Sequence, residues 1–328
     1  MIERQAIREA PRPPLLQGTQ NDPTRPPAPA EPVLAVENIQ GNILAGFNKD
    51  HQTLLFLKVQ NVADFRRWLG ELIPFIATTS EVLTFNWLFK EIRRRRKAET
   101  RAVQATWINI ALSFPILKAL SGDGTALQKS AQEIPDYKDW AEPELLAAEA
   151  FQDQAFKEGL QARSIDLGDP RDAQEGEDPE DIEGNRNNWV VGGPGNEADV
   201  VVIVAGDSFT ELAAEVARIE ESIYSGRTRD GDHANSGVTI LHKQQGATLP
   251  PPLAGHEHFG FLDGVSQPGL RGRVSKDERD LLTPRQNPAD PDQGKPGQDL
   301  LWPGEFVFGY PGQNPKAKEV SDPGVDSL

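Results

Sequence analysis

Two separate stretches of the sequence repeat one pattern, in which a short apolar run, an amphipathic run and a second short apolar run follow each other. The short runs have the length and the β-branched content of buried strands. The amphipathic runs place their apolar residues on one helical face. In chain order these segments are residues 53–59, 62–72, 105–113, 199–205, 209–224 and 237–243. Two split βαβ units of this kind predict an α+β fold of ferredoxin-like type, an antiparallel four-stranded sheet with helices on one face.

Polar residues mark where the two main helices are expected to begin. Asn61 and Ser208 each precede an amphipathic run, and each can accept a hydrogen bond from a backbone N–H of the first turn. A short helix is expected over 116–120. The segments 82–97 and 142–162 also have helical periodicity, so further helices are predicted outside the two units.

The distribution of Pro, Gly and charge divides the chain into three parts. Residues 1–32 carry eight prolines with charges between them and are expected to form a disordered tail. Residues 33–250 hold the ferredoxin-like domain, with an acidic, Gly- and Pro-rich surface insertion at 166–183. Residues 251–328 have little periodicity and are expected to form a motif segment and an extended arm, with a long loop over 271–300.

Charge and composition exclude several classes of partner and site. The formal net charge of −16 argues against nucleic acid and anionic membranes, whose phosphates need a positive surface. The chain has no cysteine, which removes disulfides, thiolate catalysis and metal–thiolate sites. No apolar run reaches the ~18 residues of a membrane span, and no signal peptide is visible. We therefore expect a cytoplasmic protein, with export by another route left open.

A glycine-rich, apolar segment holds the strongest candidate for a catalytic side chain. Asp263 lies within residues 260–264, Gly-Phe-Leu-Asp-Gly, where glycine permits a flat ligand to approach the backbone. Phe259, Phe261 and Leu262 would form an apolar wall beside the aspartate. A poorly solvated carboxylate can exchange protons with a bound reactant. The same residues also suit a tight turn in which Asp263 only caps backbone N–H groups.

Four segments of the chain together resemble one enzyme family. They lie at residues 37–50, 155–159 with 168–170, 256–269 and 302–311. In the same order they are similar to segments of the dye-decolorizing peroxidases, heme enzymes that consume hydrogen peroxide. Gly-x-x-Asp-Gly alone is a weak pattern, whereas four segments in family order are specific. The ferredoxin-like halves of that family agree with the fold predicted from periodicity.

The resemblance implies roles for the residues of the Gly-x-x-Asp-Gly motif. Asp263 would stand over the distal face of heme b, accept a proton from hydrogen peroxide and return it to the leaving oxygen. Phe261, Leu262, Gly264 and Ser266 would line the cofactor site. An aromatic reductant, such as a phenol or a dye, would supply the electrons.

The same resemblance implies that part of the heme site lies outside this sequence. In the family, the histidine that ligates the iron and the distal arginine belong to the second ferredoxin-like half. We expect a C-terminal-half chain or fragment to supply both residues, as the partner in a heterodimer. Arg271 and Arg273 lie near the motif but do not match the family's arginine. Trp302 and Tyr310 are candidates for an electron relay from bulky dyes.

Two other functions stay open. The chain could be a truncated relative that binds or scaffolds without catalysis. Alternatively, His256 and His258 form a His-x-His pair that, with Asp263, could hold a metal ion in a non-heme site. Exposed apolar surface would favour the split peroxidase, because a lone monomer rarely shows a large apolar patch.

Overall fold

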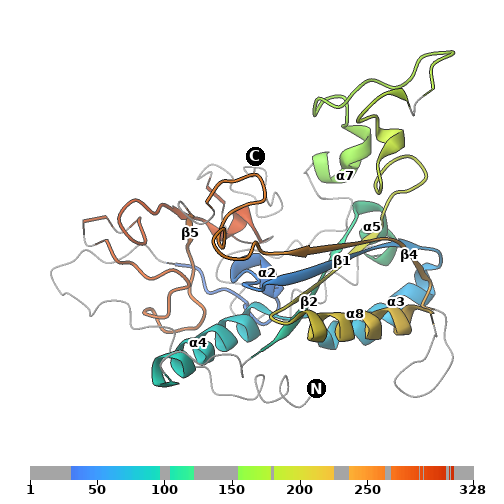
Figure 1. Ribbon diagram of the computed structural model, residues 1–328. Coiled ribbons are helices and arrows are strands. Elements are labelled where there is room, and N and C mark those ends of the chain that lie inside the picture. Colours follow the sequence, from blue (N-terminus) through green and yellow to red (C-terminus); the bar gives the residue numbers. More distant parts are fainter. Residues whose placement is uncertain are drawn as a thin grey trace.

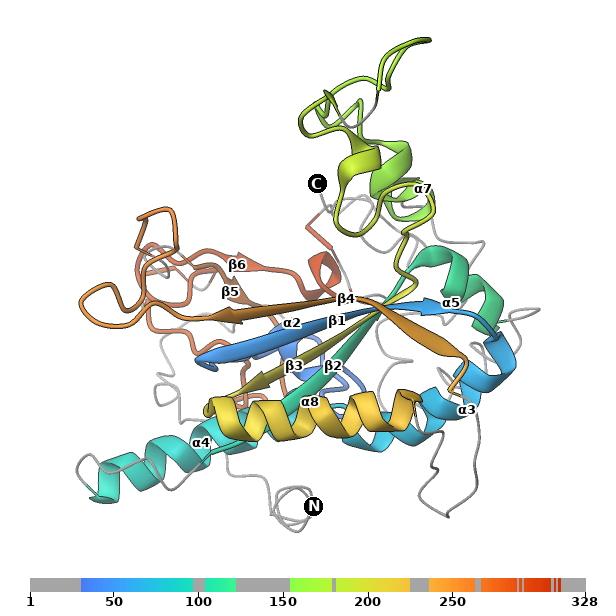
Figure 2. The same ribbon diagram turned by 45° about the vertical axis from the view of Figure 1, so that its right-hand side comes forward.

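The computed structural model describes most of the chain from residue 31 onward. The residues that it describes are 31–96, 104–121, 154–178, 181–224, 236–262, 267–287, 289–290, 292–307, 310 and 312–313. Within them, a four-stranded sheet forms the centre of the molecule, and a two-stranded sheet lies in the C-terminal arm (Figure 1 and Figure 2). No helix in this part of the chain is long and apolar enough to cross a lipid bilayer.

All four strands of the central sheet run antiparallel to their neighbours, in the order β2-β3-β1-β4. The strands are β1 (His51–Val59), β2 (Thr106–Leu112), β3 (Val200–Gly206) and β4 (Val238–Ala247). Each strand–helix–strand unit is split, because a strand of the other unit lies between its own two strands. The predicted α+β, ferredoxin-like sheet is confirmed.

Two long helices cover one face of this sheet (Figure 2). They are α3 (Val62–Leu72) and α8 (Phe209–Tyr224), with the bounds predicted from periodicity. Asn61 begins α3 by accepting a hydrogen bond from the N–H of Asp64 at 3.0 Å. Ser208 precedes α8 in the same way, with its hydroxyl oxygen 3.5 Å from the N–H of Glu211. Both caps satisfy donors that the first helical turn leaves free.

The main hydrophobic core lies between the sheet and these two helices. Alternate strand residues, among them Leu55, Leu57 and Val202, point toward the helices and are fully buried. Phe65 of α3 and Ile219 of α8 pack against them. Each Å² of apolar area removed from water stabilises the fold by about 25 cal/mol. The helices therefore pack on the face of the sheet that carries these apolar residues.

The other face of the sheet is covered at one end by two further helices. These are α2 (Gly41–Leu44) and α4 (Thr79–Arg96), which pack against each other. A second hydrophobic cluster forms there around Trp107 of β2, and Phe85 of α4 contacts it edge-to-face with 5.5 Å between ring centroids. The amphipathic segment predicted at 82–97 is therefore a helix that begins three residues earlier.

The other described helices are short. They are η1 (Ile73–Phe75), α5 (Phe114–Ser121), α7 (Gln154–Ala162), η5 (Arg186–Asn188) and η6 (Pro303–Glu305). The short helix expected over 116–120 is thus confirmed as α5. Of the helix expected over 142–162, residues 142–153 lie outside the described residues. The described part breaks at Gly159, whose φ of +75° is not helical.

β4 is longer than the sequence pattern predicted. The prediction ended this strand at residue 243, whereas β4 pairs with β1 as far as Ala247, which lies opposite His51. The register shifts between Phe56 and Leu57, so that one residue of β4 is skipped. The last residues of β4 have no apolar alternation. Their strand conformation comes from pairing with β1, which a propensity argument does not detect.

The acidic insertion predicted at 166–183 forms turns that ion pairs hold together. Arg171 pairs with Glu177 at 2.7 Å, and Arg186 pairs with Asp172 at 2.5 Å. Together with α7, these turns project from the body of the molecule (Figure 1). The insertion therefore lies on the surface, as its composition predicted.

The C-terminal arm folds back on the segment that precedes the sheet. Its strands β5 (Gly269–Leu270) and β6 (Leu300–Leu301) pair in parallel. The N–H of Leu34 donates to the carbonyl of Arg273 at 2.7 Å. Residues at the two ends of the described chain are thereby joined, although more than two hundred positions separate them in the sequence.

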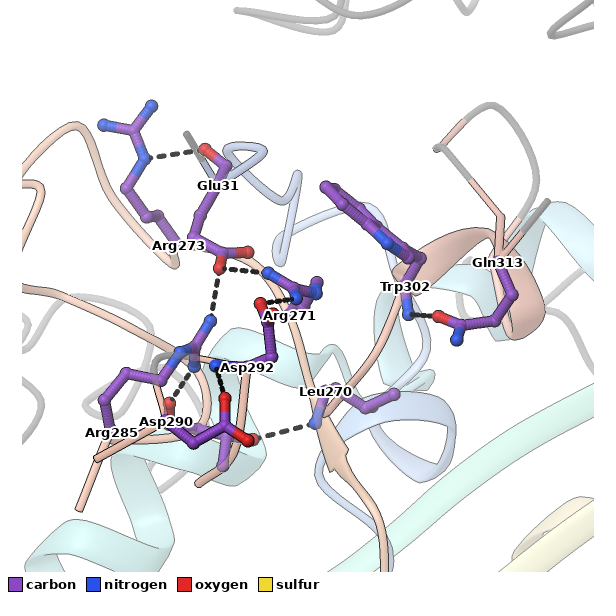
Figure 3. Close-up of polar contacts among 10 residues, drawn as sticks. Glu31, Leu270, Arg271, Arg273, Arg285, Asp290, Asp292, Trp302 and Gln313 are labelled. Carbon is purple, nitrogen blue, oxygen red and sulfur yellow. Dashed lines mark hydrogen bonds and ion pairs between the residues drawn. The ribbon is translucent and has the colours of Figure 1, made fainter. Parts of the chain in front are cut away.

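Buried ion pairs reinforce this junction (Figure 3). Glu31 is only 4% exposed and accepts hydrogen bonds from Arg271, at 3.0 Å, and from Arg285. Arg271 also pairs with Asp292, and its guanidinium lies 4.7 Å from the ring centroid of Trp302. Glu31 falls within the segment predicted to be a disordered tail. Ordered structure thus begins earlier than the sequence indicated.

Candidate functional site

The segment that precedes the motif aspartate is a tight hairpin. His256 bridges Leu262, and the N–H of Glu257 donates to the carbonyl of Phe261 at 2.7 Å. At the tip, the N–H of Gly260 donates to the carbonyl of Glu257 at 2.9 Å. Gly260 has a φ of +99°, a conformation that strains residues with a Cβ atom. The turn itself thus requires the first glycine of the motif.

The apolar side chains of this hairpin face solvent. Phe259 and Phe261 are 75% and 73% exposed, and their ring centroids lie 6.0 Å apart in an edge-to-face arrangement. Leu262 is 55% exposed. Apolar side chains exposed together in water are unfavourable, so these three residues form a candidate contact surface.

A cavity of about 400 Å³ opens beside the base of the hairpin. Its walls come from the first residues of β1, from the end of β4 up to Thr248, and from residues 255–258 of the hairpin. Because β4 continues to Ala247, the paired ends of the two strands form one side of this cavity. The volume lies within the range of about 300–1,000 Å³ that is typical of ligand sites.

Three histidines line the cavity, namely His51, His256 and His258. The Nδ1 atom of His256 is buried and has no hydrogen-bond partner among the described residues. The ring of His51 packs against Phe209 with 6.1 Å between centroids. Within the described ranges, no three His, Cys, Asp or Glu side chains come together in a way that could hold a metal ion. Asp263, the third residue of the metal hypothesis, lies outside those ranges.

A buried lysine also lines the cavity. The side chain of Lys49 is 4% exposed, its Nζ lies 2.5 Å from a carboxylate oxygen of Asp207, and the same atom lies 4.5 Å from the ring centroid of Phe85. Desolvation lowers the pKa of Lys49 below 10.5, and the hydrogen bond to Asp207 opposes that shift. The Asp207 carboxylate and the Phe85 ring offset the cost of burying the ammonium group. Lys49 therefore anchors the loop before β1.

The residues predicted to form the heme site are described only in part. Phe261 and Leu262 lie on the exposed hairpin, with Leu262 opposite the cavity-lining His256. Asp263, Gly264 and Ser266 lie outside the described residues, so the roles assigned to them stay predictions. The described part of the motif is the end of the hairpin, where the side chains of Phe261 and Leu262 are exposed.

The other candidates near the motif have partners within the arm. The hydroxyl of Tyr310 accepts a hydrogen bond from the N–H of Ala35 at 2.8 Å. Trp302 lies against the guanidinium of Arg271. Arg273 donates to a backbone carbonyl of the N-terminal segment at 3.0 Å. These contacts hold the arm in place, and the electron relay through Trp302 or Tyr310 stays a prediction.

Sequence reasoning missed several polar residues of the cavity. Lys49 lies in the family-like segment 37–50 but had no role assigned to it, and Gln52, Gln244 and Thr248 lie in no motif. The pairing of β1 with β4 brings these residues together. The apolar runs gave no signal for them, because both strands extend beyond those runs. β1 begins at His51 rather than at residue 53, and β4 ends at Ala247 rather than at residue 243.

Comparison with known proteins identifies relatives of this fold. Residues 38–133 match the family model described as the DyP dimeric alpha+beta barrel domain. The chain is 25% identical over 298 residues to the dye-decolorizing peroxidase msp1 of Mycetinis scorodonius, covering 88% of this chain and 42% of that protein. It is 26% identical over 273 residues to the dye-decolorizing peroxidase of Mycena epipterygia, covering 81% and 38%. These findings support a DyP-type family for the chain, which is similar to dye-decolorizing peroxidases over most of its length.

Solved dye-decolorizing peroxidases share this fold. A point mutant of the enzyme from Pleurotus ostreatus matches with a TM-score of 0.56 at 26% identity, covering 83% of this chain and 44% of that one. An ancestral D-type enzyme matches with a TM-score of 0.51 at 28% identity, covering 88% and 48%. This chain spans about two fifths of the length of the curated dye-decolorizing peroxidases that it matches. The activity of the whole enzymes is therefore only proposed for this chain.

Proposed function

We propose that this chain supplies the distal side of a heme peroxidase that reduces hydrogen peroxide and oxidises dyes or phenols. The histidine that ligates the iron and the distal arginine come from a second polypeptide, a C-terminal half that closes around the same heme. The observation that carries the proposal is the apolar surface of Phe259, Phe261 and Leu262, which is exposed immediately before Asp263 of the family motif.

The hairpin suits a flat, apolar macrocycle such as heme b. A Cβ atom added at Gly260 would meet no described atom within 4 Å, so a planar ligand has room to approach the backbone. Phe261 and Leu262 offer apolar contact, and Gly264 and Ser266 follow them in the motif. Bound heme would supply the electron transfer with peroxide. The role of these residues would be to hold its apolar surface and to exclude water.

Asp263 is the proton carrier in this proposal. It follows two exposed apolar side chains, Phe261 and Leu262, whose surface a partner and heme would cover. In a site closed in that way its carboxylate would accept a proton from hydrogen peroxide and return it to the oxygen that leaves as water. The hydrogen-bonding reach required is about 2.6–3.2 Å, directly or through one water.

The sheet offers a further surface for the partner. Leu54 and Phe56 of β1, and Val201 and Ile203 of β3, alternate with the core residues and lie on the face away from α3 and α8. All four are only half-buried. A C-terminal half that covered them together with the hairpin would remove apolar area from water, which stabilises association.

Co-expression tests this function. We expect the chain produced with the polypeptide encoded downstream of it to show a heme Soret band, and the chain produced alone to lack one. Phe261→Asp should abolish the band of the complex, because it places a charge on the proposed contact surface. Leu160→Asp is the matched control. Leu160 is 61% exposed on the projecting α7, so the band should persist.

The alternative functions give different results in the same experiment. A truncated scaffold protein shows no Soret band with or without the downstream polypeptide, and that outcome would contradict the peroxidase proposal. A non-heme metal protein based on His256 and His258 would instead bind Zn²⁺ as the isolated chain, measured by titration calorimetry. His256→Ala would then remove the binding.

A further inference from the structure

A second cavity, of about 350 Å³, lies on the helix-covered face of the sheet, between α3 and α8. Residues at one-turn spacing line it from both helices, because positions three and four apart share a helical face. From α3 these are Trp68, Glu71 and Leu72, and from α8 they are Glu215, Arg218, Ile219 and Ser222. This volume lies within the range of about 300–1,000 Å³ that is typical of small-molecule sites. It does not share residues with the cavity beside the hairpin.

An immobilised indole forms one wall of this cavity. The Nε1–H of Trp68 donates to the hydroxyl of Ser222 at 3.0 Å, and that hydroxyl donates to the carbonyl of Ile219 at 2.7 Å. Trp68 is 5% exposed, so its polar atom is satisfied while its ring is held by packing. Phe75 and Ile108 add further apolar wall. The surface presented to a ligand is thus flat, apolar and already positioned.

The charged side chains of the cavity leave one negative charge uncompensated. Arg218 and Glu215 form an ion pair at 2.6 Å and so neutralise each other. Glu71 is exposed and has no ion-pair or hydrogen-bond partner among the described residues. The chain as a whole carries a net charge of −16, which attracts cations toward the molecule. The site is therefore complementary to an apolar body that carries a positive charge.

We propose that this cavity binds an organic cation with a compact aromatic body. The ring of the ligand packs between Trp68 and Phe75, and its ammonium group lies at the rim beside Glu71. Aromatic faces and a carboxylate both attract an ammonium group. The proposal is independent of the heme site, because no residue of the hairpin contributes to this cavity.

Titration calorimetry with two matched probes tests the proposal on the full chain. The probes are 1-naphthylmethylamine, which is cationic at neutral pH, and 1-naphthalenemethanol, its neutral analogue. We expect the amine to bind about three- to fivefold more tightly, the effect of one partly exposed ion pair. Glu71→Gln should remove that difference. Glu211→Gln on α8, outside the cavity, should preserve it.

The position of the bound probe is tested separately. The chain has six tryptophans, so the indole N–H signal of Trp68 in a ¹⁵N correlation spectrum is first assigned with Trp68→Phe. We expect the amine to shift this signal as it saturates the site. Three results would each overturn the proposal: no binding of either probe, equal affinity for both probes, or binding that leaves the Trp68 signal in place.

Discussion

Glu177 orders the acidic insertion by holding two groups of the same loop. Its carboxylate pairs with Arg171 at 2.7 Å and accepts a hydrogen bond from the N–H of Gln174 at 2.9 Å. The hydrogen bonds from Arg171 and then from Gln174 lower the pKa of Glu177 from 4.5 to about 2. Because the folded pKa lies below the unfolded one, the ordered loop is favoured above pH 4.5 and loses this contribution as the pH falls toward 2.

We expect Glu177→Gln to increase hydrogen exchange of the Gln174 amide at neutral pH. The free energy of global unfolding should not change measurably, because the pair is exposed to solvent and screened. Amide exchange followed by mass spectrometry over residues 171–178 measures the first quantity and urea unfolding measures the second, with Glu175→Gln as a control in the same loop. In the unchanged chain the protection factor of this amide should fall between pH 4.5 and pH 2. A protection factor independent of pH would refute the role of Glu177.

At the scale of elements, the outer edge of the sheet is closed by side chains. β2 is an edge strand, and the amide of Gln40 donates to the carbonyl of Ile110 at 2.9 Å and accepts from its N–H at 2.8 Å. Asn109 donates to the carbonyl of Ala77 at 2.9 Å and accepts from the N–H of Asn42 at 2.9 Å. The bonds of Gln40 use backbone groups of β2 that would otherwise be free to pair with another chain. Those of Asn109 attach β2 to the segments at Asn42 and Ala77.

Gln40→Ala should therefore destabilise the sheet by about 1–3 kcal/mol, because it leaves a nearly buried N–H and C=O of Ile110 without partners. Urea unfolding measures the change. Gln60→Ala is the matched control, since the Gln60 amide makes one long, exposed bond to Thr239 at 3.3 Å. Its effect should stay within about 0.5 kcal/mol. Equal effects of the two substitutions would show that Gln40 does not close the edge.

The elements that sequence predicted well are those with apolar periodicity. Residues 62–72 and 209–224 form helices with the expected ends, because capping and one apolar face coincide there. The end of β4 was missed, since Gln244 and Gln245 have no strand propensity and pair with β1 by register alone. The cavity beside the hairpin was missed for the same reason, because that pairing builds one of its sides.

At the scale of the whole molecule, buried charges attach the arm to the rest of the chain. Glu31 lies between the guanidinium groups of Arg271 and Arg285 (Figure 3). All three side chains are at most 7% exposed. Sequence reasoning placed Glu31 in a Pro-rich tail because its partners lie about 240 residues away, a distance that no local pattern covers. The contact forms only when the chain folds and brings the arm back to Glu31.

Glu31→Gln tests this attachment. The amide keeps the shape of the side chain but removes the buried negative charge that the two guanidinium groups share, which should cost about 3–5 kcal/mol. We expect limited proteolysis to cut the arm between residues 267 and 307 faster, while the four-stranded sheet stays protected. Asp277→Asn is the control, because Asp277 pairs with Arg279 on the surface of the same arm. An unchanged rate of cleavage in Glu31→Gln would contradict this account.

The central claim is that Asp263 carries a proton for hydrogen peroxide in a heme site shared with a second polypeptide. The most direct test is the rate of peroxide-driven dye oxidation by the assembled complex with Asp263→Asn, whose amide has the same shape but cannot take up the proton. We predict that the Soret band is retained and that the rate falls at least about 100-fold, as for loss of a general acid–base group. A retained band with an unchanged rate would contradict the claim.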